Sequence, residues 1–484
     1  MRERLPGGIN SVGSGVSHSF EDVKEAFARE GQGHVFRFWD GLAAPQREML
    51  LDQCAVLDLP ALRTALAATT DHAASGPARL APVEVERIPE HGGDAARFAE
   101  ARKRGEELLA QGRVGLMVVA GGQATRLGFP GPKGTFPVGP VSQRSLFEIQ
   151  AQKIRRLRER YGTALPWYVM TSPATDEATR SFFAEHDLFG LPASDVVFFC
   201  QGMVPSFDFD GRLILASPGQ LAENPDGHGG SLTALLTSGV LDDAQRRGVT
   251  TLFYYQVDNP LIQMADPAFL GFHADAGAEA SCKVARKVDP MEKVGILATV
   301  DDRLGVVEYT EFDEQHRDAR DEDGELLYWA GNLAIHAFEV AFVRRIAQDA
   351  DRWLPFHASE KKIPTVDDAG EPVSPSEPNG RKLERFVFDA LPAARDVALV
   401  ETDRSRDFSP VKNAEGTDSP ETARRDLTAQ YRAWLEAAGL TPPPDTALEI
   451  DHSCIDSAED ACALGLRDLS DAGKALILGA GARA

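Results

Sequence analysis

The stretch VGLMVVAGGQATRLGFPGPKGTFPVGPVSQRSLFEIQAQKI, residues 114–154, decides the fold of this chain. Its first six residues form an apolar run that is too short for a helix and ends at a pair of glycines, a pattern typical of a buried strand. A glycine-rich turn follows, up to Lys133. From about Arg144 onward, apolar residues recur at helical spacing. The stretch therefore predicts a strand, a turn and a helix in that order.

The turn itself can bind an anion. In a glycine-rich turn, backbone N–H groups that no side chain covers can form a nest that binds a phosphate. Arg126 and Lys133 add positive charge to this turn. A plain glycine-rich connector with two solvated cations is the alternative interpretation. The spacing excludes two familiar motifs, because the P-loop needs Gly-Lys-Ser/Thr in sequence and the dinucleotide fingerprint needs G-x-G-x-x-G.

Length, charge and cysteine usage limit the classes of protein that the chain can belong to. A chain of 484 residues exceeds one ordinary core, so two or three domains are expected. Its net charge of −23 argues against a nucleic-acid or membrane-surface binder, whose partners are themselves anionic. Five scattered cysteines without a C-x-x-C pair indicate reduced thiols and no structural zinc. With no apolar leader or long apolar stretch, we expect a cytoplasmic protein, whose oligomeric state stays open.

Beyond the opening stretch, strand and helix patterns alternate, which is typical of a mostly parallel sheet covered by helices on both faces. Strands are expected at 114–119, 167–171, 196–200, 251–257, 280–288, 295–300, 305–309 and 332–337, and helices at 95–111, 176–186, 230–247 and 420–438. We predict a mostly helical region over residues 1–110, a central domain over 111–400 and a small carboxyl-terminal domain over 401–484.

Polar residues follow several of the expected strands. Sites in open α/β sheets form beyond the carboxyl ends of the strands. The residues that stand there are Gln201, the segment PDGHGG at 225–230, Asp258, Glu308 and Asn332. Each of them alone could be a loop cap or the start of a turn.

The order of these motifs resembles one family. The turn AGGQATRLG followed by PKG is similar to the signature of sugar-phosphate nucleotidyltransferases, and the longer stretch resembles the UDP-N-acetylglucosamine (UDP-N-acetylhexosamine) pyrophosphorylases. Ala124 stands where that family usually has glycine, and alanine would strain the turn if the position needed a positive φ. Nine further segments between residues 36 and 435 resemble the family in order: WYVMTSPATDEATRSFF, FFCQGMVP, PDGHGGSLTAL, VDNPLIQMADPAFLGF, GVVEYTE, AGNLAIHAF, KKIPTVD, PNGRKLERFVFD and FSPVKNAEG.

The resemblance implies a Rossmann-like nucleotidyltransferase fold, GT-A-like, with a mixed, mostly parallel sheet, flanking helices, a helical amino-terminal cap and a small carboxyl-terminal domain. It also implies a role for each matching residue. The catalytic cations would be Arg126, Lys133 and Lys412. The nucleotide would be bound by Ala120, Gly121, Gly122, Gln201, Gly227 and Asp258, the last of which would also ligate Mg²⁺. The sugar would be bound by His228, Gly295, Glu308 and Asn332.

The implied reaction is reversible uridylyl transfer, in which UTP and N-acetylglucosamine 1-phosphate give UDP-N-acetylglucosamine and pyrophosphate. His228 leaves the sugar open, because Gly-His-Gly is more like the UDP-glucose and broad UDP-sugar pyrophosphorylases, where the acetylhexosamine enzymes usually have asparagine. A non-catalytic nucleotide-sugar binding protein is the alternative from a different class. His336 and His357 are expected to be packed or solvated and receive no role.

Overall fold

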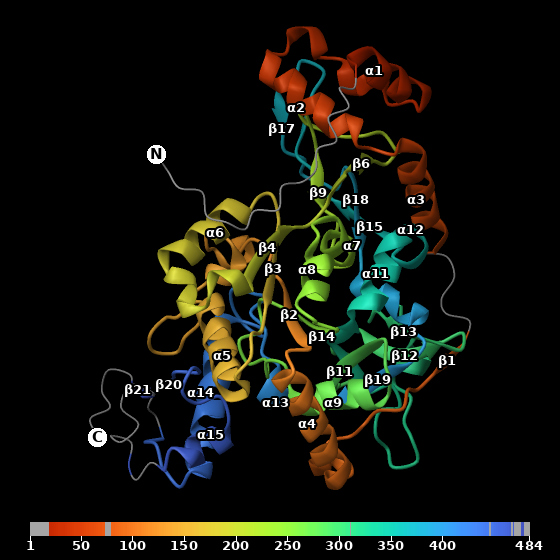
Figure 1. Ribbon diagram of the computed structural model, residues 1–484. Coiled ribbons are helices and arrows are strands. Elements are labelled where there is room, and N and C mark those ends of the chain that lie inside the picture. The colour runs from red at the N-terminus through yellow and green to blue at the C-terminus, as the bar shows by residue number, and fades with distance from the viewer. Residues whose placement is uncertain are drawn as a thin grey trace.

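The computed structural model describes residues 19–72, 79–309, 311–444, 447–465, 468 and 476–478. At its centre is a ten-stranded mixed sheet, in which the strand order is β1-β12-β14-β10-β2-β3-β4, and β11, β13 and β19 pair beside this path (Figure 1). The strands are β1 (Leu80–Ala81), β2 (Val114–Val119), β3 (Trp167–Thr171), β4 (Val196–Cys200), β10 (Thr251–Gln256), β11 (Ala280–Arg286), β12 (Ile296–Val300), β13 (Arg303–Val307), β14 (Ala330–Glu339) and β19 (Val397–Glu401). The predicted α/β class is confirmed.

One half of the sheet is parallel. β10 pairs with β2, β2 with β3 and β3 with β4, all in the parallel sense. Their carboxyl ends therefore meet at one edge, which gathers the turns that follow them. β14 runs antiparallel to β10, and the strands beyond it continue mostly in antiparallel pairs.

Helices cover both faces of the sheet. Successive residues of a strand point to opposite faces, so Leu116 and Val118 of β2 enter one hydrophobic core whereas Met117 enters the other. The first core is shared with α4 (Ala95–Ala110), α5 (Leu146–Tyr161), α9 (Pro267–Asp275) and α14 (Pro420–Ala437), and the second with α7 (Gly230–Thr237), α8 (Val240–Arg246) and α11 (Val340–Gln348). The result is a three-layer arrangement.

The single helix predicted over 230–247 is wrong, because the structure has two helices there. The break falls between α7 and α8 at Gly239, whose φ of 78° is left-handed. Glycine adopts this conformation without the steric penalty that a side chain would bring, and it ends a helix at this position.

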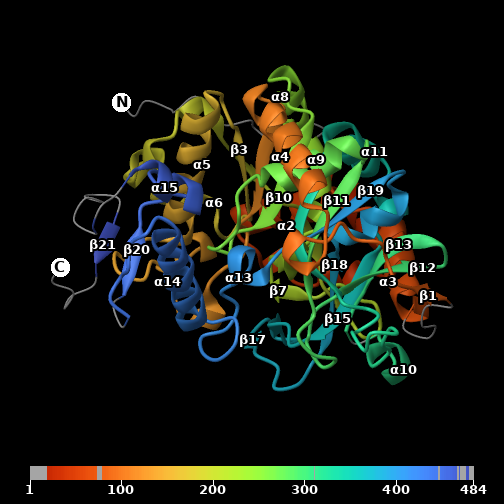
Figure 2. The same ribbon diagram turned by 90° about the horizontal axis from the view of Figure 1, so that it is seen from below.

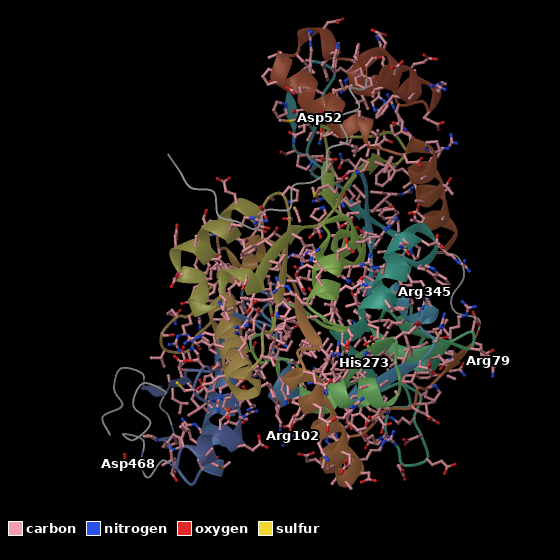
Figure 3. The ribbon with its side chains drawn as sticks, viewed as in Figure 1. Asp52, Arg79, Arg102, His273, Arg345 and Asp468 are labelled. Atoms are coloured by element: carbon pink, nitrogen blue, oxygen red, sulfur yellow. The ribbon has the colours of Figure 1, made fainter. Side chains whose placement is uncertain are left out.

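Polar contacts attach helices on the two faces to the beginning of β11. His273 of α9 lies buried, with its Nδ1 2.8 Å from Ser281 Oγ. Arg345 of α11 donates to Glu279 Oε2 at 2.5 Å. Figure 3 shows both side chains.

The two ends of the chain pack on different parts of this centre. Helices α1 (Phe20–Arg29), α2 (Ala44–Ala55) and α3 (Leu59–His72) share a separate core with Phe207 and Leu383, at the top of Figure 1. The carboxyl-terminal helices α14 and α15 (Ala458–Ala463) lie beside α5, and Arg156 of α5 binds Asp460 of α15 at 2.6 Å (Figure 2). Among the described helices, none combines the length and the apolar character that crossing a membrane requires.

Candidate functional site

The turn after β2 presents unpaired backbone donors. Across the described residues, the N–H groups of Gly121, Gly122 and Gln123 donate to no protein acceptor, whereas Lys133 N–H closes the turn on Gly122 O at 2.9 Å. Neighbouring free N–H groups form an anion-binding nest. At Gly121 a Cβ would lie 2.3 Å from Gln201 Oε1, so a side chain there would require Gln201 to shift. The turn can therefore hold a phosphate at its open side.

Ala124 fits this turn without strain. Its φ is −92° and its ψ is 26°, outside the left-handed region, and its side chain is 1% exposed. The family's glycine is therefore not needed at this position for a positive φ. Left-handed backbone occurs instead at Gly128 and Gly131, which keep their glycines.

A lysine and an aspartate face each other across the ends of two neighbouring strands. Val119 of β2 and Gln256 of β10 are partners in register, so the turns that follow the two strands lie close together. Lys133 Nζ lies 2.8 Å from Asp258 Oδ2, and their side chains are only 20% and 15% exposed. Arg126, on the short 3-10 helix after the turn, is exposed and has no partner within the described residues.

The segment that carries Lys412 is attached to the end of β10. Val411 N–H donates to the carbonyl oxygen of Asp258 at 2.9 Å. Asn259 supports the same segment with both ends of its amide, donating to Asp407 O at 2.7 Å and accepting from Ser409 N–H at 3.1 Å. The structure thus attaches the backbone of the residue before Lys412 to Asp258, although the two are far apart in the sequence.

Asp407 anchors this segment in the protein interior. Its carboxylate pairs with Lys283, whose side chain is 1% exposed and also contacts Asp266 at 2.8 Å. It also accepts from Gln263 N–H at 2.7 Å. The side chain of Lys412 itself is half exposed, with its Nζ 4.0 Å from Asp418 Oδ2.

Gln201 lies at the end of β4, beside a buried carboxyl group that sequence analysis did not single out. Its Nε2 is 3.5 Å from Asp226 Oδ1. Burial of Asp226, which is 8% exposed, raises the pKa of its carboxyl group to about 7, although the charge of Arg385 opposes the shift. Gly227 follows with a φ of 85°, and a Cβ there would lie 2.4 Å from Arg385 O, so only glycine fits.

Gly295, Glu308 and Asn332 come together on the antiparallel side of the sheet. A Cβ on Gly295 would lie 3.4 Å from Glu308 Oε1, and Asn332 N–H donates to Gly295 O at 2.9 Å. β14 is irregular here, since Asn332 Oδ1 accepts from the N–H of Ala334, whose φ of 55° is left-handed. Irregular strands of this kind often aim side chains at functional sites.

His228 follows Gly227 and packs against the segment after β18 (Gly380–Arg385). Its Nδ1 accepts a hydrogen bond from Val387 N–H at 3.1 Å, and its ring stacks on Phe386 with centroids 5.3 Å apart. Burial lowers the pKa of the imidazole to about 4, and the positive charge of His357 adds to the shift. Tyr254 of β10 donates to the carbonyl oxygen of His228 at 3.3 Å, which ties this loop to the sheet.

The donor set around Asp258 limits the metal chemistry that the site can support. Among the residues that the structure describes, no three His, Cys, Asp or Glu side chains converge as a metal site. Mg²⁺ commonly binds through one or two carboxylates together with substrate phosphates. A single carboxylate beside an anion-binding turn fits that mode and does not fit a cage made of protein ligands alone.

Comparison with known proteins extends over nearly the whole chain. A family model described as UTP–glucose-1-phosphate uridylyltransferase matches residues 77–419. The UDP-N-acetylhexosamine pyrophosphorylase-like protein 1 of Homo sapiens is 41% identical over 441 residues, which cover 87% of this chain and 86% of that protein. The UDP-N-acetylglucosamine pyrophosphorylase of Saccharomyces cerevisiae is 36% identical over 453 residues, with coverage of 89% and 94%. The crystal structure of the uridine diphosphate N-acetylglucosamine pyrophosphorylase from Trypanosoma brucei, 27% identical, covers 92% of this chain and 95% of that one with a TM-score of 0.79.

The buried carboxyl group of Asp226 should make stability depend on pH. Because its pKa is raised from 3.8 to about 7 on folding, the folded state holds a proton that the unfolded state releases, and stability falls as the pH rises through this range. Between pH 5 and pH 8 we expect the free energy of unfolding of the wild type to fall by about 2 to 3 kcal/mol more than that of Asp226→Asn, whose side chain cannot ionise. Urea unfolding of both proteins at the two pH values measures this difference. Parallel pH dependences would contradict the assignment.

Proposed function

This chain belongs to the UTP–glucose-1-phosphate uridylyltransferase family, and we propose that it transfers the uridylyl group of UTP to N-acetylglucosamine 1-phosphate with release of pyrophosphate. The observation that supports this most is the convergence of the free N–H groups after β2, the Lys133–Asp258 pair and the segment of Lys412. The names of curated relatives that are 36% to 41% identical favour an acetylated hexosamine over glucose.

The chemistry requires charge neutralisation more than proton transfer. A phosphate oxygen of the sugar 1-phosphate attacks the α-phosphorus of UTP, and the bond from that phosphorus to the bridging oxygen of pyrophosphate breaks. The nucleophile is already an anion, so no general base is needed. The protein must hold mutually repelling anions together and support charge at phosphorus. In our proposal, Arg126, Lys133, Lys412 and the backbone N–H groups of the turn perform this task.

We further propose Mg²⁺ as the cofactor, with Asp258 as the protein ligand. The bound ion would supply positive charge to the phosphate oxygens. The carboxylate of Asp258 is paired with Lys133, the residue whose N–H closes the turn, so the charge of Asp258 is balanced. The pair keeps either group from being left buried and uncompensated when no ligand is bound.

A non-catalytic nucleotide-sugar binding protein is the weaker alternative. Such a protein would keep the residues that surround the base and could lose the cations that neutralise the phosphates. This chain keeps Arg126, Lys133 and Lys412; Lys133 pairs with Asp258, and Val411, which precedes Lys412, is hydrogen-bonded to the carbonyl oxygen of Asp258. The retained cations favour an enzyme.

A competition assay tests the proposed substrate. The purified protein is incubated with UTP and an equimolar mixture of N-acetylglucosamine, N-acetylgalactosamine and glucose 1-phosphates, and the UDP-sugars formed are separated and counted. We expect UDP-N-acetylglucosamine to form fastest. Clear preference for glucose 1-phosphate would establish the UDP-glucose alternative, and the absence of all UDP-sugars together with the absence of pyrophosphate exchange would reject the enzyme.

Replacement of Lys133 tests the proposed catalytic charge. We expect Lys133→Ala to lower kcat by about two orders of magnitude or more, roughly 3 kcal/mol, because one preorganised charge is lost. Lys103→Ala on the exposed face of α4 is the matched control. Since the variant leaves Asp258 unpaired, its unfolding midpoint is measured alongside turnover. A folded variant with near wild-type turnover would remove Lys133 from the catalytic set.

The proposed metal ligand is tested by a titration. Asp258→Asn keeps the shape of the side chain and removes the negative charge, so we expect the Mg²⁺ concentration for half-maximal rate to rise at least about tenfold. Initial rates are measured over a range of Mg²⁺ at fixed UTP, with Asp275→Asn at the exposed end of α9 as control. An unchanged titration curve would exclude Asp258 from the metal site.

A further inference from the structure

A histidine and an aspartate that sequence analysis left without a role form a pair beside Glu308. His357 lies on β15 (Phe356–Lys361) and Asp389 on the 3-10 helix η8 (Val387–Ala393). Nε2 of His357 donates to Asp389 Oδ2 at 2.8 Å. β15 reaches this point by pairing antiparallel with β18 (Gly380–Arg385), and η8 follows β18 after one residue, Phe386.

Phe386 connects this pair to the candidate sugar-binding residues. The ring of His357 stacks on Phe386 with centroids 4.3 Å apart and planes at 22°, and His228 stacks on the same ring at 5.3 Å and 17°. η8 also packs against β13, the strand that leads to Glu308. His228 and His357 therefore both stack on the ring of Phe386, and Asp389 is held there through its hydrogen bond with His357.

The other ring nitrogen of His357 is available to a ligand. The side chain is 41% exposed, and its Nδ1 has no hydrogen-bond partner among the described residues and is not a buried orphan. Because Asp389 accepts from Nε2, protonation of Nδ1 makes His357 a cationic donor on the open side of the site.

The charged groups around His357 favour this protonated form. Burial opposes ionisation, but the hydrogen bond and charge of Asp389, with the charges of Glu311 and Glu308, outweigh it and raise the pKa of the imidazole. His228 faces the same region but stays neutral. α3 packs against β15, and its Arg63 is paired with Glu30. Glu384 is the register partner of His357 on β18.

Glu308 and His357 have complementary hydrogen-bonding abilities. A carboxylate only accepts and an imidazolium only donates, whereas a sugar hydroxyl does both. An acceptor and a charged donor placed together can therefore hold one hydroxyl in both directions, through two charge-assisted hydrogen bonds. Phe386 provides an apolar surface against which the His357 ring is stacked.

We propose that His357, held by Asp389 and stacked on Phe386, donates through Nδ1 to a ring hydroxyl of the sugar 1-phosphate that Glu308 also binds. The inference rests on the proposed function, because it assigns a recognition residue to the same reaction. It makes His357 and Asp389 determinants of sugar specificity and leaves the binding of UTP to other residues.

The test combines residue replacement with removal of single hydroxyls from the substrate. KM and kcat are measured for wild type and His357→Ala with N-acetylglucosamine 1-phosphate and with its 3-, 4- and 6-deoxy analogues. We expect His357→Ala to raise KM for the complete sugar about tenfold to a hundredfold, as for a lost hydrogen bond to a charged group, while KM for UTP stays within about twofold. For one deoxy analogue, wild type and His357→Ala should have the same KM, because the hydroxyl group that His357 would bind is already missing from that analogue.

A matched pair elsewhere in the chain provides the control. His316 binds Asp313 Oδ2 at 2.8 Å on α10 (Glu314–Arg317), away from Phe386. His316→Ala should leave every KM unchanged. Asp389→Asn keeps the shape of the partner of His357 but removes its charge, so the pKa of His357 should fall. The pH above which KM for the sugar rises should therefore move downward. In His357→Ala this pH-dependent rise in KM should be absent. Thermal unfolding shows whether each variant is folded. If His357→Ala is not folded, the pH dependence of KM in Asp389→Asn provides the test.

The outcomes separate the inference from the function. An equal penalty on all deoxy analogues, an unchanged KM for the sugar, or a parallel rise in KM for UTP would each overturn the role of His357. If the wild type forms no UDP-sugar from any sugar 1-phosphate, the proposed function fails instead, and the inference fails with it.

Discussion

The ion pair between Lys133 and Asp258 is the contact on which the rest of the site depends. It joins Lys133, at the end of the glycine-rich turn after β2, to Asp258, which follows β10. The carbonyl oxygen of Asp258 also accepts a hydrogen bond from the N–H of Val411 in the carboxyl-terminal segment. Three parts of the chain thus meet at one residue, Asp258. With the pair mostly buried, loss of either charge would leave the other poorly solvated, which favours keeping both residues in place.

The chain as a whole is strongly acidic, yet its candidate ligands are anions. With a net charge of −23, long-range attraction cannot recruit nucleotides. Binding must depend on local groups, and the structure provides two kinds of them. Free N–H groups of the turn carry partial positive charge without adding a titratable group, and Lys133 and Lys412 each have an aspartate within 4.0 Å.

The residues around Phe386 differ in chemistry from those around the glycine-rich turn after β2. Neutral His228, the His357–Asp389 pair and Glu308 offer donors and acceptors around an aromatic ring, as suits a polyhydroxylated ligand. Because Nδ1 of His228 accepts from Val387 N–H, the neutral imidazole has one further N–H to donate, at Nε2.

The sequence by itself determined the elements and the order of the motifs. Apolar periodicity located β2, β3 and β4 to the residue, since buried strands are encoded by local patterns. It also identified the glycine turn, although the break at Gly239 was missed because one glycine in a helical pattern is ambiguous.

Tertiary structure alone decided which distant residues meet. The pairing of β2 with β10 lets Lys133 reach Asp258, and the hydrogen bonds of Asn259 attach the segment that carries Lys412 to the end of β10. The raised pKa of Asp226 and the pair of His357 with Asp389 depend on burial and on contacts between strands far apart in the sequence. No local pattern encodes such contacts, because they arise only when packing of the sheet fixes the distances between its edges.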